Sequence, residues 1–98
     1  MFTEKQRKKL LERFEIDCDV KNHYPITVLD KILKLNLVLS IYFKSQIAAA
    51  DFLGVKQPNI WRYKRGVIAL PHERATKLED FTNKAVLVEE IRFTKDDF

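Results

Sequence analysis

Residues 46–65 read QIAAADFLGVKQPNIWRYKR, and this stretch decides the fold. Gly54 can adopt the positive φ that ends a helix and turns the chain sharply, which other residues do only at a steric cost. Ala50 stands where the first helix would press on the second, at a crossing that tolerates little more than a methyl group. The pattern therefore predicts two helices that meet at a sharp corner, over residues 45–53 and from residue 56 or 57 to residue 65.

The two predicted helices divide into an inner and an outer face. The residues expected to face inward are Ala49, Leu53, Val55, Ile60 and Tyr63. The residues expected to face outward are Lys56, Gln57, Trp61, Arg62 and Arg65. An outward face that combines cations, an amide and an aromatic ring suits a DNA groove.

Length and composition limit the class of protein. A chain of 98 residues suffices for one core, and a second domain is not expected. One cysteine excludes an internal disulfide framework, and no apolar block with a cleavage site marks a secretory signal, so we expect a cytoplasmic protein. The apolar run at residues 35–43 contains Asn36 and Ser40 and falls short of the ~20 residues of a membrane span.

The basic charge is concentrated on the predicted corner. The net charge is +4, and residues 44–74 carry six lysines and arginines against two acids, whereas the rest of the chain carries twelve of each sign. A solvated basic face is the plain alternative. Because the excess coincides with the corner, we favour neutralisation of DNA phosphates.

A helix is expected ahead of the corner, and another near the N-terminus. Thr3 with Gln6 resembles a capping box for a helix over residues 4–14, whose apolar side would be Leu10, Leu11 and Phe14. Its basic outer face is expected to be mainly solvated, with phosphate contacts as the lesser alternative; it consists of Lys5, Arg7, Lys8 and Lys9. Residues 14–20, FEIDCDV, alternate and allow a short strand.

Thr27 with Asp30 gives a second capping signal, for a long helix over residues 28–43 that supports the corner. A strand stays open as an alternative because residues 33–43 also alternate. As a helix, the segment has a broad core stripe of Val28, Ile32, Leu35, Leu39, Tyr42 and Phe43. A second ridge consists of Leu29, Leu33, Leu37 and Ile41. The second ridge needs a cover, and the N-terminal helix is favoured over a second subunit.

The C-terminal half continues with short helices. Ser45 is the expected N-cap of the first helix of the corner. Pro58 fits the first turn of the second helix, and Gly66 is expected to end that helix. Residues 67–70 form a loop, and Pro71 begins a helix. The residues of that helix expected to close the core are Ala75, Leu78 and Phe81. A last helix is expected at residues 87–92, with a strand as the alternative, followed by a loose tail at residues 94–98.

Catalytic and metal-binding patterns are missing from the sequence. Cys18 and His23 do not have zinc-site spacing, and Cys18 is expected to be a small buried residue. His72 has no evident acid or nucleophile partner, and two glycines make no phosphate loop. We therefore expect no enzyme activity, no metal and no cofactor.

The segments FKSQIAAADFLGVKQPNIWRYKRG, at 43–66, and ALPHERATKLED, at 69–80, resemble the Cro-type phage repressors and the YdaS-like antitoxins. That family's pattern runs F-G-S-Q, A, L-G-V, then a loop and I-P-x-E-R-A. The match covers about residues 37–92, with Lys44 in place of the usual glycine and Trp61 in place of a small polar residue. The resemblance implies an all-α, lambda-repressor-like helix-turn-helix domain of about five helices over residues 26–93, with room for a short β segment. Residues 1–25 lie outside the match, and the resemblance does not explain them. From the sequence we expect an extension packed on the core there, and a tail at residues 94–98.

The resemblance also implies a recognition helix whose N-terminal half faces the bases in the major groove. The base contacts expected from it are Gln57, Pro58, Trp61 and Arg62, which suit adenine, a thymine methyl group and guanine. The phosphate contacts expected from it are Ser45, Gln46, Lys56, Asn59, Lys64 and Arg65.

These expectations predict a sequence-specific repressor of Cro type that binds double-stranded DNA. One recognition helix reads few bases, so a homodimer on an inverted repeat is expected. An antitoxin or protein-interaction module with a toxin partner and secondary DNA binding is the alternative. A DNA-bending architectural or recombination factor is a third and weaker one.

Overall fold

A computed structural model describes residues 2–16 and 24–97, and within these residues the chain is all-α and has no strand. Its helices are α1 (Glu4–Arg13), α3 (Ile26–Tyr42), α4 (Gln46–Leu53), α5 (Gln57–Arg65), α6 (His72–Phe81) and α7 (Val88–Ile91), followed by the 3-10 turn η1 (Lys95–Asp97). The predicted helices are confirmed, and the strand alternatives at residues 33–43 and 87–92 are wrong. Among the described helices, none has the length and apolar character needed to cross a membrane.

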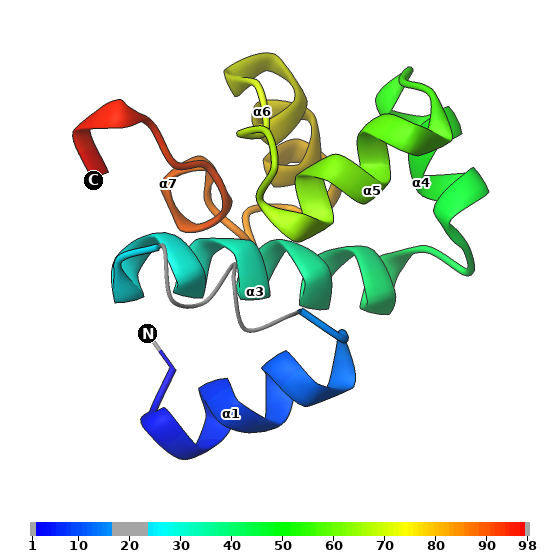
Figure 1. The fold of residues 1–98 in the computed structure, drawn as a ribbon. Coiled ribbons are helices and arrows are strands. Elements are labelled where there is room, and N and C mark those ends of the chain that lie inside the picture. Colours follow the sequence, from blue (N-terminus) through cyan, green and yellow to red (C-terminus); the bar gives the residue numbers. More distant parts are fainter. Residues whose placement is uncertain (1, 17–23, 98) are drawn as a thin grey trace.

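Helix α3 organises the molecule. It runs through the middle, with α1 on one side and α4 to α7 on the other (Figure 1). Its C-terminal half packs against α4 to α7 through Leu35, Val38 and Leu39. Its N-terminal half belongs to a second cluster with Ile16, Phe93 and the apolar side of α1; this half contributes Val28, Leu29, Ile32 and Leu33. The predicted lengthwise stripes of α3 are therefore wrong in part, because its two halves face different neighbours.

The N-terminal helix covers α3, as favoured from the sequence, but only over half the second ridge. Leu29 and Leu33 are buried in the cluster that includes α1. Leu37 is half-buried, and Ile41 is 69% exposed. The cover ends early because α1 spans ten residues and α3 spans seventeen.

One capping prediction is confirmed and the other is wrong. Gln6 N donates to Thr3 Oγ1 at 3.1 Å and Thr3 N to Gln6 Oε1 at 2.9 Å, which completes the predicted box. At α3 the N-cap is Pro25, and no side chain caps the helix. Asp30 instead accepts hydrogen bonds from Arg7 of α1, since a largely buried carboxylate is stabilised most by a charged partner.

Three further predictions need correction. Pro71 is the N-cap of α6 rather than its first residue. Phe81 is 47% exposed, so α6 closes the core through Ala75 and Leu78 alone. The tail predicted to be loose at residues 94–98 is attached to α3 at one point, because Asp97 of η1 pairs with Lys31.

The short strand that the alternation of residues 14–20 allowed is not found in residues 14–16, the described part of that segment. Residues 14–16 form a turn and its exit, with Glu15 at φ 55°. Residues 17–20, the predicted burial of Cys18, and His23 lie outside the described residues.

Candidate nucleic-acid interface

The corner between α4 and α5 is built from local sequence signals. Ser45 Oγ accepts a hydrogen bond from Ala48 N at 3.1 Å and so caps α4. Gly54 ends α4 in the left-handed region at φ 70°. Val55 N then donates to Ala50 O at 3.0 Å, which closes the turn. Pro58 lies in the first turn of α5, and Gly66, at φ 73°, ends that helix.

Helix α5 has one buried face and one open face. Ile60 is fully buried and Tyr63 is 6% exposed, while Val55 just before the helix is half-buried. The predicted inward set is therefore confirmed, since Ala49 and Leu53 of α4 are buried as well. Of the predicted DNA contacts, those exposed are Ser45, Gln46, Lys56, Gln57, Pro58, Trp61 and Arg62, and those half-buried are Asn59, Lys64 and Arg65.

The open face of α5 carries side chains that hold one another. Trp61 is 49% exposed, and the guanidinium of Arg65 lies 5.4 Å from the centroid of its ring. Arg62 Nη1 donates to Asn59 Oδ1 at 3.0 Å, one helical turn earlier. This contact keeps the Arg62 guanidinium beside the N-terminal half of the helix.

Two partly buried hydrogen bonds fix the C-terminal end of α5. Asn36 of α3 is 1% exposed, and its amide Nδ2 donates to Lys64 O and to Ile32 O, each at 2.8 Å. Tyr24 Oη donates to Gly66 O at 2.6 Å. Sequence reasoning missed both contacts, because a lone asparagine within an apolar helix gives no sign of a partner 28 residues away. The bond from Asn36 ties α5 to α3, and the bond from Tyr24 ties the end of α5 to the segment just before α3.

Lys64 lines a cleft of ≈ 200 Å³ between α5, α3, the start of α4 and the turn after α1. The cleft is lined by Phe14, Glu15, Asn36, Gln46, Trp61, Lys64 and Arg65. Burial, and then the neighbouring charge of Arg65, lowers the pKa of the Lys64 ammonium. An anion beside Lys64 would favour its charged form.

Helix α6 supplies contacts that the sequence did not reveal. Arg74 Nη1 donates to Leu53 O at 2.6 Å, and the Lys77 ammonium donates to Phe52 O. These cations satisfy carbonyl groups at the C-terminal end of α4, where positive charge is favourable. Arg74 belongs to the basic excess of residues 44–74, but it is occupied within the fold.

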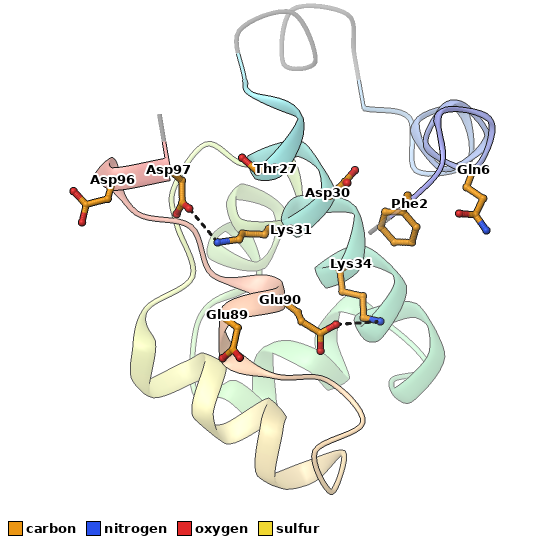
Figure 2. A pocket seen from close by; sticks show the side chains of 10 residues that line it. All are labelled: Phe2, Gln6, Thr27, Asp30, Lys31, Lys34, Glu89, Glu90, Asp96 and Asp97. Carbon is orange, nitrogen blue, oxygen red and sulfur yellow. Dashed lines mark hydrogen bonds and ion pairs between the residues drawn. The ribbon is translucent and has the colours of Figure 1, made fainter.

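A larger cavity of ≈ 690 Å³ lies between α1, α3, α7 and η1. Figure 2 shows two ion pairs there, Lys31 with Asp97 at 3.2 Å and Lys34 with Glu90 at 3.9 Å. None of the predicted contact residues lies in it. The pairs fasten the C-terminal elements to α3. No group of three metal-ligating side chains occurs among the described residues, and His72 is exposed in the first turn of α6.

Comparisons of the chain with protein-family models, with curated proteins and with solved structures return no match.

Proposed function

We propose that this chain binds a specific site on double-stranded DNA as a repressor of Cro type, with α5 in the major groove. The observation that supports this most strongly is the division of α5 into two faces. Ile60 and Tyr63 anchor it to the core, whereas Gln57, Trp61 and Arg62 remain exposed on its outer side. A helix held rigidly on one side and open on the other can enter a groove without rearrangement.

The open face offers distinct chemistry to different bases. The amide of Gln57 can pair with N6 and N7 of adenine, and the guanidinium of Arg62 with O6 and N7 of guanine. Pro58 and Trp61 provide apolar surface for a thymine methyl group. All four lie in the first six of the nine residues of α5, toward the end that would reach the bases first.

Groups around this face are suited to phosphate. Ser45 and Gln46 are exposed at the start of α4, where backbone N–H groups and the helix dipole favour an anion. Lys56 is exposed immediately before α5, and Lys64 and Arg65 line its cleft. Such contacts fix the position of α5 and carry the salt dependence of binding.

We propose further that two copies bind an inverted repeat. A single α5 offers four candidate base contacts, which is few for selection among the competing sites of a genome. A two-fold dimer doubles these contacts over half-sites about one helical turn apart. Occupation of such a site within a promoter would block transcription.

The proposal is tested by selecting duplexes from a random pool and measuring binding of the selected site and a scrambled site. The variant Gln57→Ala/Arg62→Ala should lose about 30-fold or more for the selected site, because each bidentate contact contributes ~1–3 kcal/mol. Lys84→Asn is the control for lost charge: Lys84 is exposed after α6 at φ 65°, a conformation that asparagine tolerates.

Two outcomes contradict the proposal. The pool shows no enrichment, or the double variant binds the selected site as well as Lys84→Asn does. Enriched sites without inverted symmetry reject the dimer alone, whereas strong bending of the duplex supports the architectural alternative.

A protein-interaction role, such as that of an antitoxin, is the second candidate. It is favoured by a partly open aromatic cluster formed by α3, α4 and α6. Phe81 lies 4.6 Å from Phe52 and 6.0 Å from Tyr42, measured between ring centroids, and Tyr42 and Phe81 are 41% and 47% exposed. Exposed aromatic surface of this kind marks many protein contacts. Toxin neutralisation that survives in Gln57→Ala/Arg62→Ala would support this role.

A further inference from the structure

The C-terminal turn of α1 lies against the outer side of α5, although fifty residues separate the two. Arg65 Nη1 donates a hydrogen bond of 2.9 Å to the backbone carbonyl oxygen of Glu15. Phe14 and Glu15 also form one wall of the cleft that contains Trp61 and Lys64. The N-terminal segment therefore shapes part of the surface proposed to meet DNA.

Arg65 connects this turn to Trp61. Its guanidinium is bound to Glu15 and at the same time stacks on the indole ring, 5.4 Å from the centroid. A tryptophan that is 49% exposed has room for several rotamers, and a cation held against its ring favours one of them. The position of the C-terminal end of α1 thus influences the orientation of the Trp61 side chain, through Arg65.

Helix α1 is itself anchored to α3 at its other end. Arg7 Nε and Nη2 donate to the two carboxylate oxygens of Asp30 at 2.7 and 3.1 Å. Leu10 and Leu11 pack against the buried cluster on the N-terminal half of α3. A continuous series of contacts therefore runs from α3 through α1 and Arg65 to Trp61.

We infer that α1 is a positioning element of the DNA-reading surface, which holds Arg65 across Trp61 and so fixes the rotamer with which Trp61 meets a base pair. This inference rests on the proposed function. Selective contacts require a side chain in a defined place, whereas phosphate contacts tolerate movement. Release of α1 should consequently reduce selectivity between sites more than it reduces affinity for DNA in general.

Trp61 is the one tryptophan of the chain, so its fluorescence reports this contact with or without DNA. Arg65→Lys keeps the positive charge but loses the planar group that stacks and bonds. Arg7→Gln weakens the anchor of α1 at a distance from α5. Lys9→Gln removes an exposed charge from the outer face of α1 and is the matched control.

The experiment measures acrylamide quenching and anisotropy of Trp61 in the full chain, then binding to a selected and a scrambled duplex. Arg65→Lys and Arg7→Gln should increase quenching and lower anisotropy, and should reduce the preference for the selected duplex by about threefold to tenfold. For Arg7→Gln, binding of the scrambled duplex should stay within about twofold, because Arg7 is not among the residues proposed to meet phosphate. Lys9→Gln should change none of these values.

The inference is overturned if Trp61 in Arg65→Lys is quenched as in the unmodified chain, or if Trp61 is released and site preference is retained. Arg65 is outside the core, so its variant still decides the matter should Arg7→Gln fail to fold. If the unmodified chain shows no site preference, the proposed function fails and with it the role of α1 in reading DNA. Quenching then shows separately whether α1 holds Trp61.

Discussion

Arg7 and Asp30 form a bidentate ion pair that joins α1 to α3. Nε and Nη2 of Arg7 reach the two carboxylate oxygens at 2.7 and 3.1 Å, and the side chains are 13% and 8% exposed. The hydrogen bond with Asp30 is the main reason that the pKa of Arg7 is raised above its already high ordinary value. The Arg7 guanidinium therefore stays charged at every pH at which the protein would be handled.

Removal of Arg7 alone should destabilise the fold strongly, because Asp30 is left as a nearly buried charge. We expect Arg7→Met to lower the free energy of unfolding by about 2–4 kcal/mol, slightly less than for a fully buried pair. Arg7→Met/Asp30→Leu should recover much of this loss, since an apolar pair needs no charge partner. Urea titrations followed by circular dichroism measure both values. A double variant no more stable than the single one would contradict this explanation.

The two helix-ending glycines should differ in their tolerance of a side chain. Gly54 has φ 70°, and the nearest atom to an added Cβ is Arg74 Nη1 at 3.6 Å, an ordinary contact. Gly66 has φ 73°, but an added Cβ would lie 2.4 Å from Ile32 Cδ1, inside the core. Gly54→Ala should therefore cost about 1–2 kcal/mol from backbone strain, and Gly66→Ala about 2–4 kcal/mol.

The test of this difference is a third variant. Ile32→Val removes the Cδ1 atom that clashes, so Gly66→Ala/Ile32→Val should cost less than the sum of its single variants, as measured by urea unfolding. Strict additivity of the two changes would show that backbone strain alone explains the loss.

The corner between α4 and α5 is determined by residues that are close to one another in the sequence. It could therefore be predicted from the sequence. Ser45 caps the next turn of helix, and Gly54 and Gly66 adopt a conformation that glycine favours. The helical spacing of the apolar positions, three residues apart, was enough to place Ile60 and Tyr63 inward.

The missed features depend on partners far along the chain. Asp30, three residues after Thr27, looks like the second member of a capping box until Arg7, 23 residues away, is brought beside it. Phe81 has the spacing of a core residue, yet the core beneath α6 is already filled, with Leu78 fully buried. For the candidate site, sequence placed the outer face of α5 but not the bond from Arg65 to Glu15, which exists only because α1 packs on α3.

The C-terminal turn should detach from α3 in acid. The backbone N–H of Thr94 and then the ammonium of Lys31 lower the pKa of the Asp97 carboxyl from its ordinary value of 3.8. The ionised form therefore favours the folded turn. Its contribution is fully present above pH 3.8 and is lost as the pH falls through the lower pKa of the folded state.

Carboxyl chemical shifts of Asp97 followed by NMR measure this pKa directly. In Lys31→Ala the pKa should move toward the ordinary value without reaching it, because the bond from Thr94 N, 2.7 Å long, remains. An Asp97 that titrates at its ordinary value in the unmodified chain would contradict the described turn.

Arg74 and Lys56 both belong to the basic segment, but their substitutions should change different quantities. Loss of Arg74 should change the stability of the fold, and loss of Lys56 should change the salt dependence of DNA binding. Arg74 is bound to Leu53 O at the end of α4, so Arg74→Ala should lower the free energy of unfolding by about 1–2 kcal/mol. Lys56 is exposed just before α5, so Lys56→Ala should leave stability within about 0.5 kcal/mol. In DNA binding, Lys56→Ala should reduce the slope of log affinity against log salt by about 1 for each bound copy, the loss of one phosphate contact per copy. Arg74→Ala should leave that slope unchanged.

If Arg74→Ala alters the slope and Lys56→Ala does not, the phosphate contacts are wrongly assigned. Arg74, rather than Lys56, would then be the residue that meets DNA.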